Sequence, residues 1–145
     1  MSERETVEQV QNEIVDDFSL FDEWEDRYRY VLELGQKLPR IGDEYKREEF
    51  RVRGCQAQVW LYPTLTDGLL TYSAESDAPL VQGLLYLLLK VYSGHTPADI
   101  LAAEPEFIDR AGLAANLSPF RVNGMRATVQ QIKKYAAAYE AGNNG

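Results

Sequence analysis

Residues 80–92 constrain the fold more than any other part of the sequence, because this run is apolar nearly all round. Only Gln82 and Lys90 are strongly polar within it. The run is shorter than the roughly 18 consecutive apolar residues that identify a membrane-spanning helix. A helix that is hydrophobic on every face must be covered by other parts of the protein. The sequence therefore predicts a helix buried in the middle of the fold and ending near Ser93 and Gly94.

Further helices are predicted on both sides of this buried segment. Apolar residues recur at three- and four-residue steps within residues 5–38, which indicates two amphipathic helices separated near residues 19–22. More helices are predicted within residues 79–141. There, Thr96-Pro97-Ala98-Asp99 is typical of a helix start, and Ser118-Pro119 is expected to cap the last helix.

Strand-forming residues lie between these helical parts, at about residues 50–75. Thr66-Asp67-Gly68 is typical of a hairpin turn, and two or three antiparallel strands fit the stretch. Trp60 is expected in the core because it belongs to an alternating strand. The order of helices, hairpin and helices predicts an α+β fold, with a small antiparallel sheet packed against several helices. At 145 residues, the chain is expected to form a single domain over residues 1–145.

Charge and cysteine content exclude several classes of function. Residues 1–50 carry all of the net charge of −8, and no basic stripe is present, so neither nucleic acid nor an anionic membrane is an expected partner. Cys55 is the only cysteine, which excludes an internal disulfide and a zinc site built from several thiolates. No secretory leader or membrane-spanning run is apparent, so we expect a cytoplasmic protein. We expect neither a metal nor a resident cofactor.

His95 is the only histidine, and it lies between two predicted helices. A single histidine cannot form a histidine-rich metal site. Because connecting segments usually expose their polar side chains, His95 is expected on the surface of a loop.

Cys55 has two interpretations from its neighbours alone. A free cysteine is often a small buried hydrophobic residue, and Cys55 would then be packing at the start of a strand. Alternatively, Gly54 lets the chain bend so that the thiol sits on a loop, and Arg51 and Arg53 bring positive charge that would favour the reactive thiolate. Glycine and arginine are common near cysteines, so both interpretations remain open at this point.

The residues around Cys55 also form a longer motif, Gly54-Cys55-Gln56-Ala57-Gln58-Val59-Trp60. Together with four other segments in the expected order, this motif makes the sequence from about Phe21 to Tyr135 resemble the SufE family of sulfur acceptors. The sequence departs from the family pattern at Ala57, where we expect Ser, and at Phe120, where we expect a small polar residue. These changes are expected to affect partner contacts or loop mobility. The further blocks are residues 32–39 (LELGQKLP), 76–84 (SDAPLVQGL), 96–100 (TPADI) and 117–125 (LSPFRVNGM).

The resemblance implies a protein that accepts sulfur from a cysteine desulfurase. The desulfurase holds pyridoxal phosphate and carries a persulfide, whose outer sulfur the family's cysteine, matched by Cys55, takes over. The sulfur then passes to a scaffold complex that builds iron-sulfur clusters. The chain would be an activator of the desulfurase rather than an independent enzyme, and either a monomer or a homodimer.

The same resemblance implies roles for residues near the cysteine. Arg121 matches a family arginine that would stabilise the thiolate or persulfide anion, although a surface charge at a helix start explains it equally well. Asp77 would lie close to the cysteine loop or cap a helix. Gly54, Gln56 and Gln58 are expected to shape the loop and its partner contacts.

Two other functions remain open on the sequence. One is a non-catalytic adaptor in which Cys55 is structural and the acidic N-terminal helices bind a partner. The other is a redox sensor with one reactive cysteine. We expect the Cys55 thiol to be shielded in the isolated protein, because it lies between Gly54 and a strongly apolar strand and because a carrier must keep a persulfide from water and oxidants.

Overall fold

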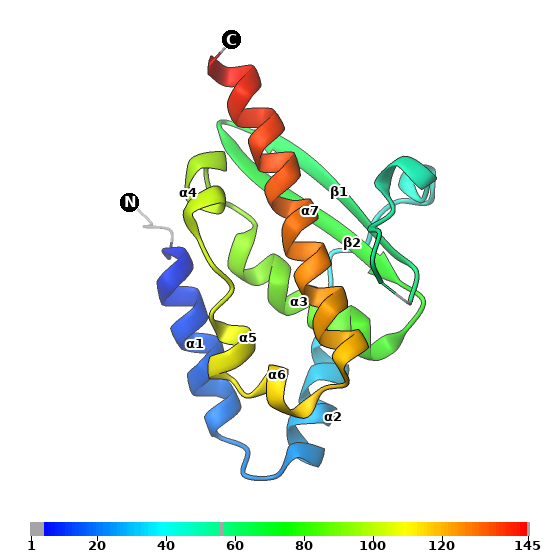
Figure 1. Ribbon diagram of the computed structural model, residues 1–145, viewed down its shortest axis with the longest axis vertical. Coiled ribbons are helices and arrows are strands. Elements are labelled where there is room, and N and C mark those ends of the chain that lie inside the picture. Colours follow the sequence, from blue (N-terminus) through cyan, green and yellow to red (C-terminus); the bar gives the residue numbers. More distant parts are fainter. Residues whose placement is uncertain (1–4, 56, 145) are drawn as a thin grey trace.

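The computed structural model describes residues 5–55 and 57–144, without the side chains of residues 143 and 144. It confirms the α+β fold: α-helices pack against one face of a two-stranded antiparallel sheet (Figure 1). The elements are α1 (Val7–Ser19), α2 (Trp24–Gly35), the short 3-10 helices η1 (Asp43–Tyr45) and η2 (Glu48–Phe50), β1 (Val59–Thr66), β2 (Leu69–Ser76), α3 (Pro79–Tyr92), α4 (Pro97–Ala102), α5 (Phe107–Arg110), α6 (Leu113–Asn116) and α7 (Pro119–Asn144).

Helix α3 lies at the centre of the fold, as its apolar sequence predicts. It packs against α1, α2, β2 and α7 (Figure 1). Most of its side chains belong to one core, to which all the other large elements contribute. Helices α2 and α3 approach so closely that a Cβ atom added to Gly83 would lie 1.9 Å from the carbonyl oxygen of Val31. Glycine is therefore required where these helices cross.

The hairpin of β1 and β2 has the predicted turn. Asp67 and Gly68 both adopt positive φ angles, 54° and 79°, and Thr66 pairs with Leu69 across the turn. An Asp-Gly pair tolerates these angles, which match the twist of the strands. The third strand that the sequence allowed is reduced to one bridge between Arg51 and Trp60.

The two faces of the hairpin have different neighbours. The inner face packs into the core and is tied to α7 by the Tyr72 hydroxyl, which donates a 2.8 Å hydrogen bond to the carbonyl of Ile132. On the outer face, Tyr45 stacks on Tyr62 with ring centroids 4.0 Å apart. Trp60 is partly exposed and lies outside the core, so the prediction that it is a core residue is wrong. Its strand alternates as expected, but its side chain points to the outer face.

The structure confirms the predicted start of α4. The Thr96 hydroxyl accepts a hydrogen bond from the backbone N–H of Asp99 at 3.1 Å, and Pro97 occupies the first turn. Ser118 plays the same part before α7, where its hydroxyl accepts the N–H of Arg121 at 3.3 Å. Both side chains satisfy helix N–H groups that have no partner within the helix.

His95 is buried rather than on the surface, with 8% of its area exposed. The backbone explains the difference. The carbonyl of His95 accepts a hydrogen bond from the N–H of Leu70 at 2.8 Å, so the connection between α3 and α4 pairs with the start of β2. The segment therefore belongs to the sheet edge instead of running over the surface.

Candidate functional site

The loop that carries Cys55 connects η2 to β1 and lies against α7. Gly54 turns the chain with a φ of 89°, an angle that L-amino acids rarely adopt. A Cβ atom at Gly54 would lie 3.2 Å from the Cβ of Ala127 in α7. The positive φ and the close approach together direct the next residue, Cys55, toward the helix.

The Cys55 side chain is half-buried and points at the start of α7. Its thiol donates to the carbonyl oxygen of Gly124, with 3.5 Å between sulfur and oxygen. A Cβ atom on Gly124 would lie 3.5 Å from the same sulfur. The thiol thus lies in direct contact with the helix backbone at Gly124. The expectation of a shielded thiol is confirmed to this extent: the sulfur is half-covered, not enclosed.

A cavity of about 410 Å³ opens beside the sulfur. Its walls are mostly apolar and come from α3, β1 and α7. Asp77, Ser118 and Arg121 add polar groups, and Phe120 lines the cavity although 62% of its area is exposed. The other lining residues are Cys55, Ala57, Val59, Ala78, Val81, Leu84, Leu85, Leu88, Gly124, Met125 and Thr128. The cavity can therefore receive a group attached to the sulfur.

Two effects act on the pKa of the Cys55 thiol. Burial raises the pKa above its ordinary value, and the Thr128 side chain, as a hydrogen-bond partner for the charged sulfur, opposes the rise. The prediction that Arg51 and Arg53 favour the thiolate is wrong, because both side chains turn to Glu48, at 3.5 Å and 3.4 Å. The net effect is a raised pKa, so burial disfavours the thiolate of Cys55 in the isolated protein.

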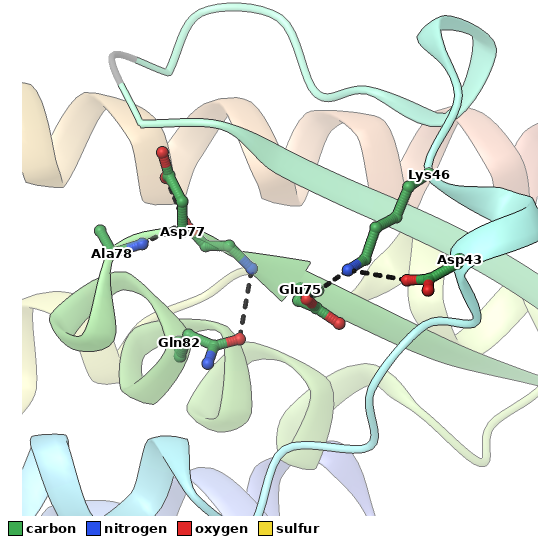
Figure 2. Close-up of polar contacts among 7 residues, drawn as sticks. Asp43, Lys46, Glu75, Asp77, Ala78 and Gln82 are labelled. Atoms are coloured by element: carbon green, nitrogen blue, oxygen red, sulfur yellow. Dashed lines mark hydrogen bonds and ion pairs between the residues drawn. The ribbon is translucent and has the colours of Figure 1, made fainter.

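Asp77 holds the cysteine loop and does not cap α3. The N-cap of α3 is Ala78, and no side chain caps this helix. One carboxylate oxygen of Asp77 accepts a hydrogen bond from the backbone N–H of Gln58 at 3.2 Å. Figure 2 shows the Asp77 side chain directed toward the loop, away from Gln82. The carboxylate thus joins the end of β2 to the segment that follows Cys55.

The strand end that carries Asp77 is itself fixed to α3. The Ser76 hydroxyl accepts the N–H of Ala78, and the side-chain oxygen of Gln82 accepts the N–H of Ser76, both at 3.2 Å (Figure 2). Nearby, the Lys46 ammonium lies 2.6 Å from a carboxylate oxygen of Glu75, which joins the segment before the loop to β2 (Figure 2). These contacts fix the end of β2 in place, and the Asp77 carboxylate links the cysteine loop to it.

The structure brings together most of the residues that the resemblance implies. Cys55, Asp77 and Arg121 line one cavity, and Gly54 shapes the loop. Gln58 contributes its backbone N–H. Gln56 lies outside the described residues. The roles of these residues in chemistry remain predictions.

The sequence did not assign Gly124 and Thr128 to the site. Gly124 accepts both the Cys55 thiol and the Thr128 hydroxyl on its carbonyl oxygen. Gly124 belongs to the block of residues 117–125 that resembles the family, and Thr128 follows it by one helical turn, which puts both on one face of α7. That spacing does not show which loop packs against the face.

The described residues contain no group of three or more His, Cys, Asp or Glu side chains that could hold a metal ion. Within the same part of the chain, no helix combines the length and the apolar character needed to span a membrane.

Alkylation of Cys55 in the isolated protein should be slow at neutral pH. Because burial raises the pKa of the thiol, the reactive thiolate becomes abundant only above the ordinary thiol range. A bulky maleimide should react more slowly than iodoacetamide, and both rates should keep rising with pH where an exposed thiol has reached its plateau. The measurement is the labelling rate against pH, with urea-unfolded protein as the control. Equal rates for folded and unfolded protein would show that the thiol is freely exposed.

The chain has clear similarity to known proteins over most of its length. The family model described as "SufE: Fe-S metabolism associated domain" matches residues 12–136. An uncharacterized SufE-like protein of Rhizobium meliloti is 42% identical over 130 residues, covering 86% of this chain and 93% of the relative. An uncharacterized SufE-like protein of Synechocystis is 35% identical over 131 residues, covering 90% of this chain and 82% of the relative.

A solved structure supports the fold independently. The solution structure of a hypothetical protein from Thermus thermophilus superposes with a TM-score of 0.74. The match covers 89% of this chain and 94% of the other, at 22% sequence identity. The likeness concerns the arrangement of the helices and the hairpin.

Proposed function

The chain belongs to the SufE family, whose domain is associated with iron-sulfur metabolism, and from this premise we propose that Cys55 accepts sulfur from a cysteine desulfurase. The observation that supports this most is the position of the thiol. The only cysteine of the chain is held on a loop, half-buried, beside a cavity of about 410 Å³. A structural cysteine needs no such cavity.

The proposed reaction is thiol exchange at sulfur. The Cys55 thiolate attacks the outer sulfur of a persulfide on the desulfurase, and a new sulfur-sulfur bond forms at Cys55. The bond between the outer sulfur and the desulfurase cysteine breaks, and the electron pair leaves with that cysteine, which then takes up a proton. One thiol replaces another, so no external oxidant or reductant is needed.

The surroundings of Cys55 suit a carrier. A second thiol within reach of the persulfide would displace sulfide and close a disulfide, but the sequence contains no second cysteine. The mostly apolar walls of the cavity would surround a sulfur atom bound to Cys55 with side chains that do not react with a persulfide. The sulfur would then pass to a scaffold for iron-sulfur clusters in the cytoplasm, with pyridoxal phosphate remaining in the desulfurase.

We expect the cysteine loop to leave its resting position during transfer. The thiol donates to Gly124 and faces α7, and this contact must break before the sulfur can turn toward the persulfide of another protein. A partner that binds the open loop better than the closed loop shifts the population toward the open state. The hydrogen bond between Asp77 and the N–H of Gln58 favours the closed state.

Asp77→Arg should increase desulfurase turnover in the presence of this protein. The substitution removes the acceptor for the Gln58 N–H, and a hydrogen bond of this kind contributes about 1 kcal/mol, so the open population should rise several-fold. The measurement is alanine release by the desulfurase, combined with the alkylation rate of Cys55 in the isolated variant. Asp22→Arg is the matched control, because Asp22 is also exposed and lies far along the chain from the loop. If Asp77→Arg lowers turnover in proportion to lost binding, Asp77 is a contact residue and does not hold the loop.

The proposed function itself is tested by adding this protein to a pyridoxal-phosphate-dependent cysteine desulfurase and cysteine. We expect alanine release to rise with the concentration of this protein and to saturate. An unchanged rate with several desulfurases, each active with its own acceptor, would argue against the proposal.

A further inference from the structure

Two hydrogen-bond donors converge on one acceptor beside Cys55. The hydroxyl of Thr128 donates to the carbonyl oxygen of Gly124 at 2.8 Å, and the Cys55 thiol approaches the same oxygen at 3.5 Å. Thr128 is buried, with 1% of its area exposed, and it also lines the cavity. The Thr128 hydroxyl is therefore a buried polar group in the cavity wall, bonded to the same oxygen as the thiol.

The hydroxyl of Thr128 has a choice of acceptors. A threonine O–H rotates to suit its surroundings, and within α7 the Gly124 carbonyl already receives the backbone N–H of residue 128. The carbonyl therefore keeps a partner if the hydroxyl turns away. Gly124 has no side chain, so nothing from that residue stands between the helix and the sulfur.

We propose that Thr128 is the hydrogen-bond donor that holds the anionic sulfur of Cys55: its hydroxyl turns from the Gly124 carbonyl to the sulfur when the thiol loses its proton. This inference rests on the proposed function, since sulfur exchange needs an anion at Cys55. The deprotonated sulfur can no longer donate to Gly124 and is repelled by the carbonyl oxygen. A donor from Thr128 replaces that repulsion with an attraction.

The electrostatics around Cys55 support a role for the Thr128 hydroxyl as this donor. Burial disfavours the charged form of Cys55, and the side chain of Thr128 is the group that counteracts it. Arg51 and Arg53 pair with Glu48. The other charged groups at the cavity are Asp77 and Arg121, and neither is among the causes that shift the pKa of Cys55. A hydrogen bond to a charged group in a low-dielectric site is stronger than one in water. A hydrogen bond from Thr128 would therefore increase the fraction of Cys55 that is present as the thiolate when the partner binds.

The test compares Thr128→Val with Thr128→Ser in the isolated protein. Valine keeps the shape of threonine without the hydroxyl, and serine keeps the hydroxyl. The readouts are the ultraviolet absorbance of the thiolate and the iodoacetamide rate, both followed against pH. We expect the midpoint of the Cys55 titration to rise by about one pH unit in Thr128→Val. This change lowers the thiolate fraction about tenfold at any pH below the midpoint. The midpoint of Thr128→Ser should stay near that of the wild type.

A midpoint for Thr128→Val equal to that of the wild type would overturn the inference. Thermal unfolding checks that each variant is folded, and Thr128→Ala provides a second variant without a hydroxyl if valine disturbs packing. Sulfur transfer from a desulfurase is measured in parallel. If the wild type accepts no sulfur, the proposed function fails, whereas equal transfer by the wild type and Thr128→Val shows that only the role of Thr128 is wrong.

Discussion

Cys55→Ser should abolish sulfur acceptance and leave the fold intact. Serine has nearly the shape of cysteine, but its hydroxyl is not a nucleophile toward a persulfide under these conditions, so the reaction has no attacking group. The measurement is transfer of sulfur from a persulfidated desulfurase to the variant, which should fall to the background of a protein without cysteine.

Circular dichroism and thermal unfolding provide the control for Cys55→Ser. The side chain is only half-buried, so the unfolding temperature should change little. Sulfur acceptance by a folded Cys55→Ser variant would show that another group receives the sulfur. A variant that fails to fold would indicate instead that Cys55 is packing, as the adaptor interpretation requires.

Gly83→Ala should cause a large loss of stability, because a Cβ atom there meets a shorter contact than at any other glycine that the structure describes. The added methyl group would lie 1.9 Å from the carbonyl oxygen of Val31 and 2.6 Å from its Cγ1 atom, so α2 and α3 must move apart. Overpacking of a core typically costs about 1–3 kcal/mol, and a clash with rigid backbone belongs at or above the upper end. The free energy of unfolding in urea should therefore fall by about 3 kcal/mol or more.

Gly142→Ala is the matched control for this prediction. Gly142 also lies in a helix, α7, but a Cβ atom there would meet nothing within 4 Å. Alanine favours a helix more than glycine does, so this variant should be as stable as the wild type or slightly more stable. If both variants have the same free energy of unfolding, the close crossing of α2 and α3 is not a constraint on the fold.

The structural features that were predicted correctly are those that depend on residues close together in the sequence. The all-round apolar character of α3 requires burial, and the Asp67-Gly68 pair accepts the two positive φ angles of the hairpin turn. The Thr96 cap follows from residues within one turn. In each case, the property that determines the structure belongs to residues adjacent along the chain.

The features that were missed depend on contacts between distant segments. His95 is buried because its backbone pairs with Leu70, which no local pattern shows. Asp77 has the position of a possible helix cap, but its carboxylate reaches the loop of Gln58 instead. The arginines beside Cys55 are near it in sequence, yet they turn toward Glu48.

The environment of Cys55 also depends on contacts between distant segments that the sequence does not reveal. The motif around the cysteine indicates a nucleophile, whereas its state at rest depends on α7, far along the chain. Gly124 and Thr128 meet the sulfur only because the loop packs on that helix. Spacing within α7 places them on one face, but the partner of that face is decided by tertiary packing.

Mass spectrometry of the intact protein can determine whether Cys55 carries a single transferable sulfur atom. The protein is incubated with a cysteine desulfurase and cysteine, and parallel samples contain Cys55→Ser or a thiol reductant. We predict a mass increase of one sulfur atom in the wild type, absent from Cys55→Ser and reversed by the reductant. Added oxygen instead of sulfur would favour the redox sensor. An unchanged mass, with the desulfurase shown to carry its persulfide, would contradict the proposed function and favour the adaptor.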